Sequence, residues 1–295
     1  MIDVSVLIVN YNTADLVRQC ILSVLKQRGV QFEIIVVDNC SHDNSVSVLQ
    51  SLTPQITLLA NVNNLGFGTA NNQAFNISKG RYLFMLNPDA VCLNEQDLFL
   101  AVQFMDQHPQ YGLMGTRIID SQGQISSSVY AHYPRQKQTQ KDFSHLPGHL
   151  ASVLGASMLA RRDVFASVKG FDEDFFLYAE ETDLCLRIRE AGYMIGYLDQ
   201  VTIQHVGSAS ERGKPRADVV RRKKAGKLLF YRKHYPHQDV VNIVKHDLRR
   251  AQLRLFFLAI SKLFFGLSEK QRVSIQRYRV SLESAKQFFA SRNEL

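Results

Sequence analysis

RYLFMLNPD, residues 81–89, is the stretch of the sequence that decides the fold. Residues 82–86 are apolar strand formers without a turn residue, a pattern typical of a buried strand in a parallel sheet. The strand is expected to stop at Asn87, because Pro88 gives no N–H to a sheet and restricts the residue before it. Asp89 is therefore expected at the carboxyl end of a central strand, where open α/β sheets bind their ligands.

A carboxylate at that place can have either of two roles. With the amide of Asn87 two residues earlier, Asp89 suits a hard divalent cation that carries a diphosphate. The alternative is a turn aspartate that only follows a strand, and this stretch by itself leaves both roles open.

The upstream sequence predicts an α/β unit built from alternating strands and helices. Residues 4–9 form a β-branched run, and Thr13 can cap a helix that continues to about Gly29. Residues 32–38 form a second apolar run, and its last residue, Asp38, falls in the crevice where a nucleotide base or ribose would lie. Strands and helices that alternate at this spacing predict a parallel sheet.

Glycines and asparagines mark a further candidate ligand segment at residues 63–72, NNLGFGTANN. Small residues let a backbone approach a ligand closely, although a capped loop leading into a helix over residues 70–78 explains them equally well. No G-x-G-x-x-G follows the first strand and no G-x-x-x-x-G-K-[ST] occurs, which disfavours a dinucleotide-binding dehydrogenase and a P-loop ATPase.

Residues 176–187, FLYAEETDLCLR, hold three carboxylates that follow an expected aromatic strand and open an expected helix. The helix dipole favours acidic residues in a first turn, but it does not explain their closeness to the apolar run 175–178. An apolar wall raises the pKa of a carboxylate and makes it a better base near neutral pH.

Residues 121–149 are expected to form a long loop. His205 follows a short strand over 195–198, either as a structural residue or as a ligand.

The positive charge of the chain is concentrated at its carboxyl end. Residues 211–295 carry 21 Lys/Arg and 7 Asp/Glu, which leaves 14 basic and 20 acidic residues in the rest. Such a tail predicts an anionic partner, either nucleic acid or anionic lipid.

The four cysteines lack paired spacing, so we expect reduced cytosolic thiols. Met1 leads almost directly into a strand, so we expect no signal peptide.

Residues 248–267 combine arginines with an apolar, aromatic-rich run that Lys262 interrupts. The run is too short to span a bilayer, which needs ~20 apolar residues, and is typical of an amphipathic helix in the headgroup plane. The continuous apolar block over 253–267 disfavours nucleic acid, which favours basic side chains interleaved with single aromatics. A helix packed on the catalytic body or on a second subunit, as in a homodimer, stays open.

Taken in order, these segments resemble glycosyltransferase family 2, above all the bacterial rhamnosyltransferase-like members that extend polyprenyl-linked O-antigen or cell-wall glycans. The resemblance covers about residues 3–236 and rests on the motifs VSVLIVNYN, VVDNCSHDNS, NNLGFGTANN, LNPDA, GASMLARRDVF, GFDEDFFLYAEETDLCLR and HVGSAS. It implies the GT-A fold, an α/β architecture with a Rossmann-like, mostly parallel central sheet flanked by helices, here with a C-terminal helical extension. The implied domains are a glycosyltransferase domain over 1–236, with a nucleotide-sugar half (1–119) and an acceptor half (120–236), and a basic amphipathic extension over 237–295.

The resemblance also implies which residues form the site. The nucleotide-sugar would be bound by Val9, Asn10, Tyr11, Asp38, Asn64, Gly66, Phe67 and Asn87. The acceptor would lie against Gly155, Ala156 and Glu180, and Mg²⁺ or Mn²⁺ would be held by Asp89 and His205. Glu181 and Asp183 would be catalytic, with Glu181 as the base where the family usually has aspartate. One extra methylene moves the carboxylate by about 1 Å, which can cost roughly 10²-fold in rate unless the pocket compensates or Asp183 takes over.

The implied reaction is a single inverting displacement from a dTDP- or UDP-linked sugar, rhamnose above all, to a hydroxyl of a lipid-linked glycan. We expect an anionic membrane surface as partner, no nucleic acid, and a cytoplasmic enzyme held peripherally on the inner face of the cell membrane.

Two other functions fit the sequence less well. A sugar-phosphate nucleotidyltransferase should carry a glycine-rich, basic phosphate loop after its first strand, and residues 10–13, NYNT, are not one. A non-catalytic basic binding module would explain the tail, but not its continuous apolar block.

Overall fold

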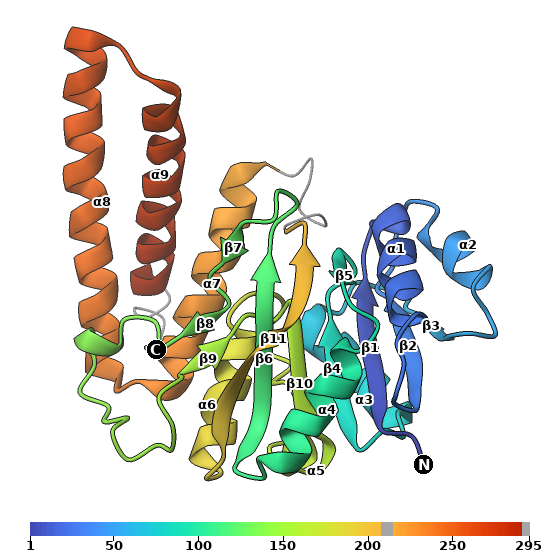
Figure 1. Cartoon of the computed structure of the whole chain (residues 1–295). Coiled ribbons are helices and arrows are strands. Elements are labelled where there is room, and N and C mark those ends of the chain that lie inside the picture. Colours follow the sequence, from blue (N-terminus) through green and yellow to red (C-terminus); the bar gives the residue numbers. More distant parts are fainter. Residues whose placement is uncertain (208–214, 291–295) are drawn as a thin grey trace. The chain divides into compact units, whose positions relative to one another are not determined.

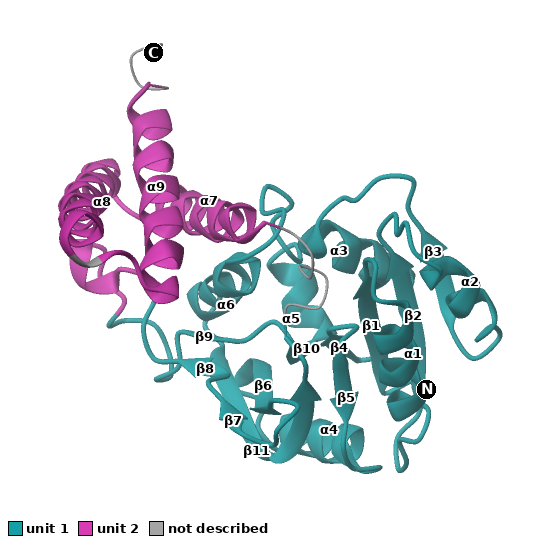
Figure 2. Ribbon diagram, turned by 90° about the horizontal axis from the view of Figure 1, so that it is seen from above, with its two compact units in different colours: residues 1–133, 144–212 teal, residues 134–143, 213–295 magenta. Residues whose placement is uncertain are grey.

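The computed structural model describes residues 1–207 and 215–290, which form two compact units. The first unit contains residues 1–133 and 144–212, and the second contains residues 134–143 and 213–295 (Figure 2). Residues 208–210 of the HVGSAS motif lie outside the described residues.

The first unit is built around a large sheet. Its strands are β1 (Val4–Asn10), β2 (Phe32–Asp38), β3 (Thr57–Ala60), β4 (Tyr82–Leu86), β5 (Ala90–Cys92), β6 (Tyr111–Ile119), β7 (Ile125–Ser126), β10 (Ser157–Arg161) and β11 (Met194–His205). Within the described residues they lie in the order β3-β2-β1-β4-β10-β6-β11-β5, with β7 beside β6 (Figure 1). Most strands share one direction, as predicted, whereas β5, β7 and β10 run antiparallel to their neighbours. A separate ribbon pairs β8 (Val129–Tyr130) with β9 (Ser152–Val153).

Helices cover both faces of this sheet. They are α1 (Ala14–Val24), α2 (Ser45–Gln50), α3 (Phe67–Ile77), α4 (Asp97–Gln107), α5 (Arg162–Ser167) and α6 (Glu180–Glu190). Val6 and Ile8 of β1 pack with α1, α2 and α4 on one face, and Leu7 and Val9 pack with α3, α5 and α6 on the other (Figure 2). A strand buried on both faces reads as a continuous apolar run, which is why the α/β fold is visible in the sequence.

The stretch over residues 82–86 forms β4 as predicted, buried along its whole length between β1 and β10. After the turn that contains Asp89, the chain re-enters the sheet as β5, antiparallel to β11, with Ala90 opposite His205. Since β1, β2, β4 and β11 run in the same direction, their carboxyl ends meet at one edge of the sheet. Asn10, Asp38 and His205 end three of these strands, and Asn87 and Asp89 follow the fourth.

Some local predictions differ from the structure. Helix α1 ends at Val24 rather than near Gly29, because Gln27 and the following backbone bond to the segment at 94–98 instead. The hydroxyl of Thr13 does not cap the helix but donates to Oδ1 of Asn10 at 2.6 Å. The segment expected as a loop over 121–149 contains β7, β8 and a 3₁₀ turn, η1 (Gln136–Gln138).

The second unit is helical. It contains η1, α7 (Arg216–His234), α8 (His237–Phe265) and α9 (Glu269–Ala290), and α8 and α9 form an antiparallel hairpin (Figure 1). The segment 134–143 is tied to α8, because Arg135 pairs with Asp247 and Asp239 accepts the hydroxyl of Thr139 at 2.9 Å. None of the described helices is long and apolar enough to cross a membrane. The functional division at residue 236 stays a prediction.

Candidate active site

Asn87, Asp89 and His205 come together where β4 passes into β5. Nε2 of His205 lies 3.1 Å from Oδ1 of Asp89 and 3.3 Å from Nδ2 of Asn87. The register of β5 on β11 fixes this arrangement, and the N–H of Val206 donates to the carbonyl of Asp89 at 3.1 Å. His205 is the last residue of the long strand β11, not a residue that follows a short strand ending at Leu198. The two predicted metal ligands therefore lie side by side.

This pair suits a divalent cation that takes few ligands from the protein. The described residues contain no group of three or more His, Cys, Asp or Glu side chains able to hold a metal. Mg²⁺, however, usually keeps several waters and binds through one or two carboxylates together with substrate phosphates. Asp89 with the neighbouring imidazole of His205 therefore fits a cation whose remaining ligands come with a diphosphate.

Asp38 and Asn10 lie at the ends of β2 and β1 and are bonded to each other. Nδ2 of Asn10 donates to Oδ2 of Asp38 at 2.7 Å, and the N–H of Ser41 donates to Oδ1 of Asp38 at 2.9 Å. Both side chains are fully buried, so they shape the adjoining loops. Tyr11 lies on one of these loops, half-buried, with its ring edge-on to His42. Binding of a nucleotide base by Asp38 stays a prediction.

Asn39 organises the loop that carries Asn64 and Gly66. Its Nδ2 donates to Oδ1 of Asn64 at 2.9 Å and to the carbonyl of Gly66 at 3.1 Å. Its Oδ1 accepts the N–H of Leu65 and Nδ2 of Asn61, both at 3.0 Å. Its partners lie 22 to 27 residues further along the chain, so no local signal separates Asn39 from an ordinary turn asparagine.

The loop that holds Gly66 is docked onto the segment before the carboxylates. The N–H of Phe67, the first residue of α3, donates to the carbonyl of Phe176 at 3.0 Å. Gly66 has a φ of +86°, and a Cβ built on it would lie 2.4 Å from the carbonyl oxygen of Phe176. Only glycine fits here, because the backbone is left-handed and another backbone approaches it closely.

We expect Gly66→Ala to destabilise the first unit strongly. A non-glycine residue in this region of φ and ψ costs about 1–3 kcal/mol, and overpacking costs another ~1–3 kcal/mol. The free energy of unfolding, measured by chemical denaturation, should therefore fall by about 2–6 kcal/mol. Gly123→Ala is the matched control, because Gly123 has a φ of +77° and nothing within 4 Å of its added Cβ. Equal losses in the two variants would show that the contact with Phe176 is not tight.

Glu180, Glu181 and Asp183 open α6 as predicted, but the predicted aromatic strand before them is wrong. Tyr178 and Ala179 have positive φ angles of +73° and +75°, and the chain turns there directly into the helix. A left-handed backbone cannot continue the extended conformation of a strand. The carboxylates thus follow a tight turn.

Glu180 is a buried candidate for the base. It is 5% exposed, and its Oε2 has no hydrogen-bond partner. Burial first, and then the charge of the adjacent Glu181, raise the pKa of Glu180 well above its usual value. Burial thus disfavours the charged carboxylate that a base must present, which argues against Glu180 as the base.

Asp183 is held in an ion pair within its own helix. Its Oδ2 lies 2.8 Å from Nε and 2.6 Å from Nη2 of Arg187. Nη1 of the same arginine donates to the carbonyls of Val168 at 2.6 Å and Gly170 at 2.8 Å. Asp183 is only 1% exposed, so this arrangement suits the positioning of α6 and the neighbouring loop more than proton transfer with a substrate.

Glu181 lies against Gly155. A Cβ built on Gly155 would be 3.5 Å from Cβ and 3.7 Å from Cγ of Glu181. The next residue, Ala156, accepts the N–H of Asn87 at 3.0 Å through its carbonyl. Gly155 thus lies beside the predicted base, and Ala156 is bonded to the predicted metal loop.

Tyr130 is a neighbour of Glu181 that the sequence did not predict. Burial raises the pKa of the Tyr130 phenol, and the negative charge of Glu181 adds to the shift. Tyr130 ends β8 and is 41% exposed. Its segment shows no hydrophobic period, which is why no local pattern points to it.

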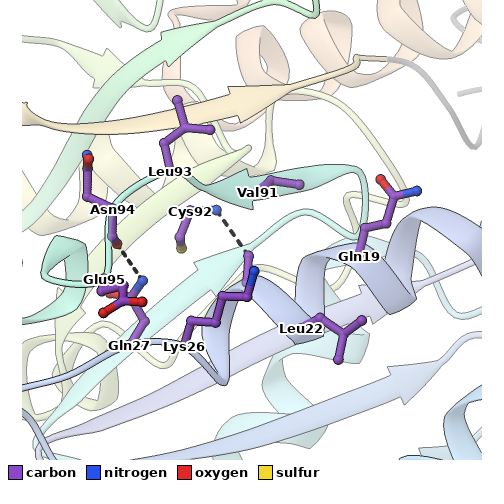
Figure 3. A pocket seen from close by; sticks show the side chains of 10 residues that line it. Gln19, Leu22, Lys26, Gln27, Val91, Cys92, Leu93, Asn94 and Glu95 are labelled. Atoms are coloured by element: carbon purple, nitrogen blue, oxygen red, sulfur yellow. Dashed lines mark hydrogen bonds between the residues drawn. The ribbon is translucent and has the colours of Figure 1, made fainter.

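A pocket of about 320 Å³ lies elsewhere in the first unit, between α1 and the segment that follows β5 (Figure 3). Hydrogen bonds join its two walls: the N–H of Cys92 donates to Oγ of Ser23 at 3.1 Å, and Nε2 of Gln27 donates to the carbonyl of Asn94 at 2.7 Å. None of the predicted site residues lines this pocket. It is therefore separate from the candidate active site.

The sequence comparisons with known proteins point to glycosyltransferases or glycan biosynthesis. Residues 5–168 match the family model described as Glycosyl transferase family 2. The chain is 28% identical over 233 residues to the O-antigen biosynthesis protein RfbC of Myxococcus xanthus, covering 73% of this chain and 18% of that protein. It is 24% identical over 246 residues to the N-acetylglucosaminyl-diphospho-decaprenol L-rhamnosyltransferase of Mycobacterium tuberculosis, covering 72% of this chain and 78% of that protein. The chain thus spans a small part of the first relative and most of the second.

Solved structures with a similar fold include a mannosyltransferase and TarS. The mannosyltransferase of Pyrobaculum calidifontis, in complex with GDP-Man and Mn²⁺, has a TM-score of 0.60 and 16% identity, covering 95% of this chain and 86% of that one. TarS 1–349 of S. aureus, in complex with UDP, has a TM-score of 0.55 and 17% identity, covering 97% and 92%. At this identity the likeness shows the fold, a GT-A architecture.

Proposed function

The chain belongs to glycosyl transferase family 2 and is a glycosyltransferase, and we propose that it is an inverting, metal-dependent enzyme acting on a lipid-linked glycan. The donor is a dTDP- or UDP-linked sugar, rhamnose above all, and the acceptor is a hydroxyl of a polyprenyl-diphosphate-linked glycan. The observation that carries the proposal is the continuity of the site. Gly155 lies beside Glu181 and Ala156 is bonded to Asn87, which supports a base and a diphosphate site at the two sides of one small-residue segment.

In the proposed reaction, Glu181 takes the proton of an acceptor hydroxyl while that oxygen attacks the anomeric carbon of the donor. The nucleoside diphosphate leaves from the opposite face, so the configuration inverts and no covalent intermediate is needed. Asn87 lies where the diphosphate is expected. Mg²⁺ or Mn²⁺, held by Asp89 and His205, would neutralise the charge that develops on the leaving group.

The comparisons support the substrate classes. One relative is named for rhamnosyl transfer with N-acetylglucosaminyl-diphospho-decaprenol and another for O-antigen biosynthesis. Solved structures of the same fold carry GDP-Man with Mn²⁺ or UDP. In our proposal the donor contacts Val9, Asn10, Tyr11, Asp38, Asn64, Gly66, Phe67 and Asn87, and the acceptor contacts Gly155, Ala156 and Glu180.

We further propose a division of labour along the chain. Residues 1–119 handle the nucleotide-sugar and residues 120–236 the acceptor, whereas residues 237–295 keep the enzyme at the cytoplasmic face of the cell membrane. A lipid-linked acceptor lies in that plane, and confinement to the same plane raises its effective concentration for the enzyme.

The proposed function is tested with a panel of nucleotide-sugars, Mn²⁺ and a short soluble glycan as acceptor. Nucleoside diphosphate released from one donor, and only with acceptor present, would support the proposal. Pyrophosphate released from a nucleoside triphosphate and a sugar phosphate would indicate a nucleotidyltransferase instead. No release from any donor in the panel would contradict transfer of the proposed kind.

A further inference from the structure

An apolar stripe runs along the second half of α8. The side chains that form it are Leu253 (59% exposed), Phe256 (61%), Phe257 (61%), Ile260 (39%), Leu263 (79%) and Phe264 (70%). Their spacing of three and four residues places them on one face of the helix. We refer to these six side chains as the α8 stripe.

The stripe is exposed although α8 has a partner helix. Nε2 of Gln271 in α9 donates to Oγ of Ser261 in α8 at 3.1 Å, and Ala251 of α8 is buried. The far end of α9 packs on α7, where the guanidinium of Arg232 lies 5.1 Å from the ring centre of Phe288. The hairpin therefore uses another face of α8 for its internal packing and leaves the stripe uncovered within its unit.

Basic side chains lie near both ends of the stripe. Residues 248–282 contain eight Lys/Arg and one Asp/Glu. Arg249, Arg250 and Arg254 are exposed near the start of the stripe, and Lys270 and Arg272 are exposed beyond the turn of the hairpin. Long basic side chains can lay their apolar stems along such a surface while their charges reach anionic groups.

We propose that the α8 stripe lies in the headgroup region of an anionic lipid bilayer, with the basic side chains near its ends on the lipid phosphates. This inference deepens the proposed function and rests on its lipid-linked acceptor. An apolar face with positive charge near its ends is complementary to that surface in both respects, since it combines apolar burial with attraction to anionic lipid. Because none of the described helices can cross a membrane, the mode is attachment in the interface plane.

The first experiment reports where the stripe lies. The chain contains no tryptophan, so Phe257→Trp introduces a single fluorescent reporter into the full-length protein. With vesicles that contain phosphatidylglycerol, its emission should shift to shorter wavelength and be quenched by lipids brominated in the acyl chains. Ile125→Trp is the matched control, because Ile125 is 73% exposed but lies on β7, and it should show neither effect. An unchanged spectrum of Phe257→Trp with these vesicles would overturn the inference.

A second experiment, co-sedimentation with vesicles, separates the apolar and electrostatic contributions to membrane binding. Phe256→Asp combined with Phe264→Asp should reduce binding at least tenfold. Replacing Arg249, Arg250 and Arg254 by Gln should weaken binding to anionic vesicles by between ten- and a hundredfold, from about 1 kcal/mol per basic residue near the surface. Replacing the exposed lysines Lys26, Lys79 and Lys169 of the first unit by Gln is the matched control for charge and should leave binding unchanged.

The outcomes distinguish this inference from the proposed function. All variants should transfer sugar to a soluble acceptor at the rate of the original protein, because none of the changed residues belongs to the candidate active site. Vesicle binding without any sugar transfer would sink the proposed function and leave the membrane surface standing. Sugar transfer without vesicle binding would contradict the membrane inference and leave the proposed transferase activity standing. A dimer in lipid-free solution that Phe256→Asp with Phe264→Asp converts to a monomer, without vesicle binding, would make the stripe a contact between two copies of the chain.

Discussion

Asp89→Asn is expected to lower sugar transfer by at least roughly 10³-fold, since charge neutralisation at a leaving diphosphate contributes several kcal/mol to a transition state. The change removes the carboxylate that lies beside His205 at the end of β4. Binding of the nucleoside diphosphate, measured by calorimetry, should also lose its dependence on Mg²⁺ or Mn²⁺. This second readout reports on the site without relying on turnover.

A matched control is available for this variant. Asp199 is an exposed aspartate on β11, paired with Arg117 at 3.3 Å, and Asp199→Asn should change neither activity nor metal dependence. Both variants should unfold at nearly the same denaturant concentration as the original protein. Full activity of Asp89→Asn, or full activity of the original protein in excess chelator, would contradict the assignment of Asp89 as the metal ligand.

Glu181→Gln is expected to lower kcat by 10²–10⁴-fold, the usual contribution of a general base, with little change in KM for the donor. The amide keeps the shape of the side chain next to Gly155 but cannot accept the proton of the acceptor hydroxyl. Steady-state kinetics with both substrates varied separately give the two effects. Glu181→Asp should also lose activity, by roughly 10²-fold, because the shorter side chain withdraws the carboxylate by about 1 Å.

The variant Asp183→Asn tests whether Asp183, rather than Glu181, is the base. This change weakens a charged hydrogen bond to Arg187, so the free energy of unfolding should fall by about 1–3 kcal/mol. The pH dependence of kcat should keep the ionisation of the base in Asp183→Asn and lose it in Glu181→Gln. The opposite pattern would show that Asp183 is the base and that Glu181 only borders the acceptor.

The sequence predicted the parts of the site that depend on strands buried on both faces. Residues 82–86 are strongly apolar and end at a proline, so β4 and the position of Asp89 follow from local chemistry. The contact between Asp89 and His205 depends instead on the antiparallel register of β5 and β11. The sequence offers no local signal for a pairing across so many residues, and only the resemblance to a family placed His205 at the metal.

The wrong prediction at residues 176–178 has a different cause. Phe176, Leu177 and Tyr178 favour a strand by composition, but Tyr178 takes a positive φ that non-glycine residues rarely adopt. The contact of Gly66 with Phe176 joins this turn to the loop before α3. Packing between segments far apart in the chain therefore outweighs the local preference of these residues for a strand. The role of Asn39 could not be predicted from the sequence for the same reason, because its partners are distant in the chain.

The most direct test of the proposed activity is the structure of the product. The full-length protein is incubated with a nucleotide-sugar of known anomeric configuration, Mn²⁺ and a polyprenyl-diphosphate-linked glycan, and the new glycosidic bond is analysed by NMR. We expect one added sugar whose anomeric configuration is opposite to that of the donor, formed by the original protein and not by Glu181→Gln. A product that retains the configuration, or equal product from Glu181→Gln, would contradict a single displacement with Glu181 as the base.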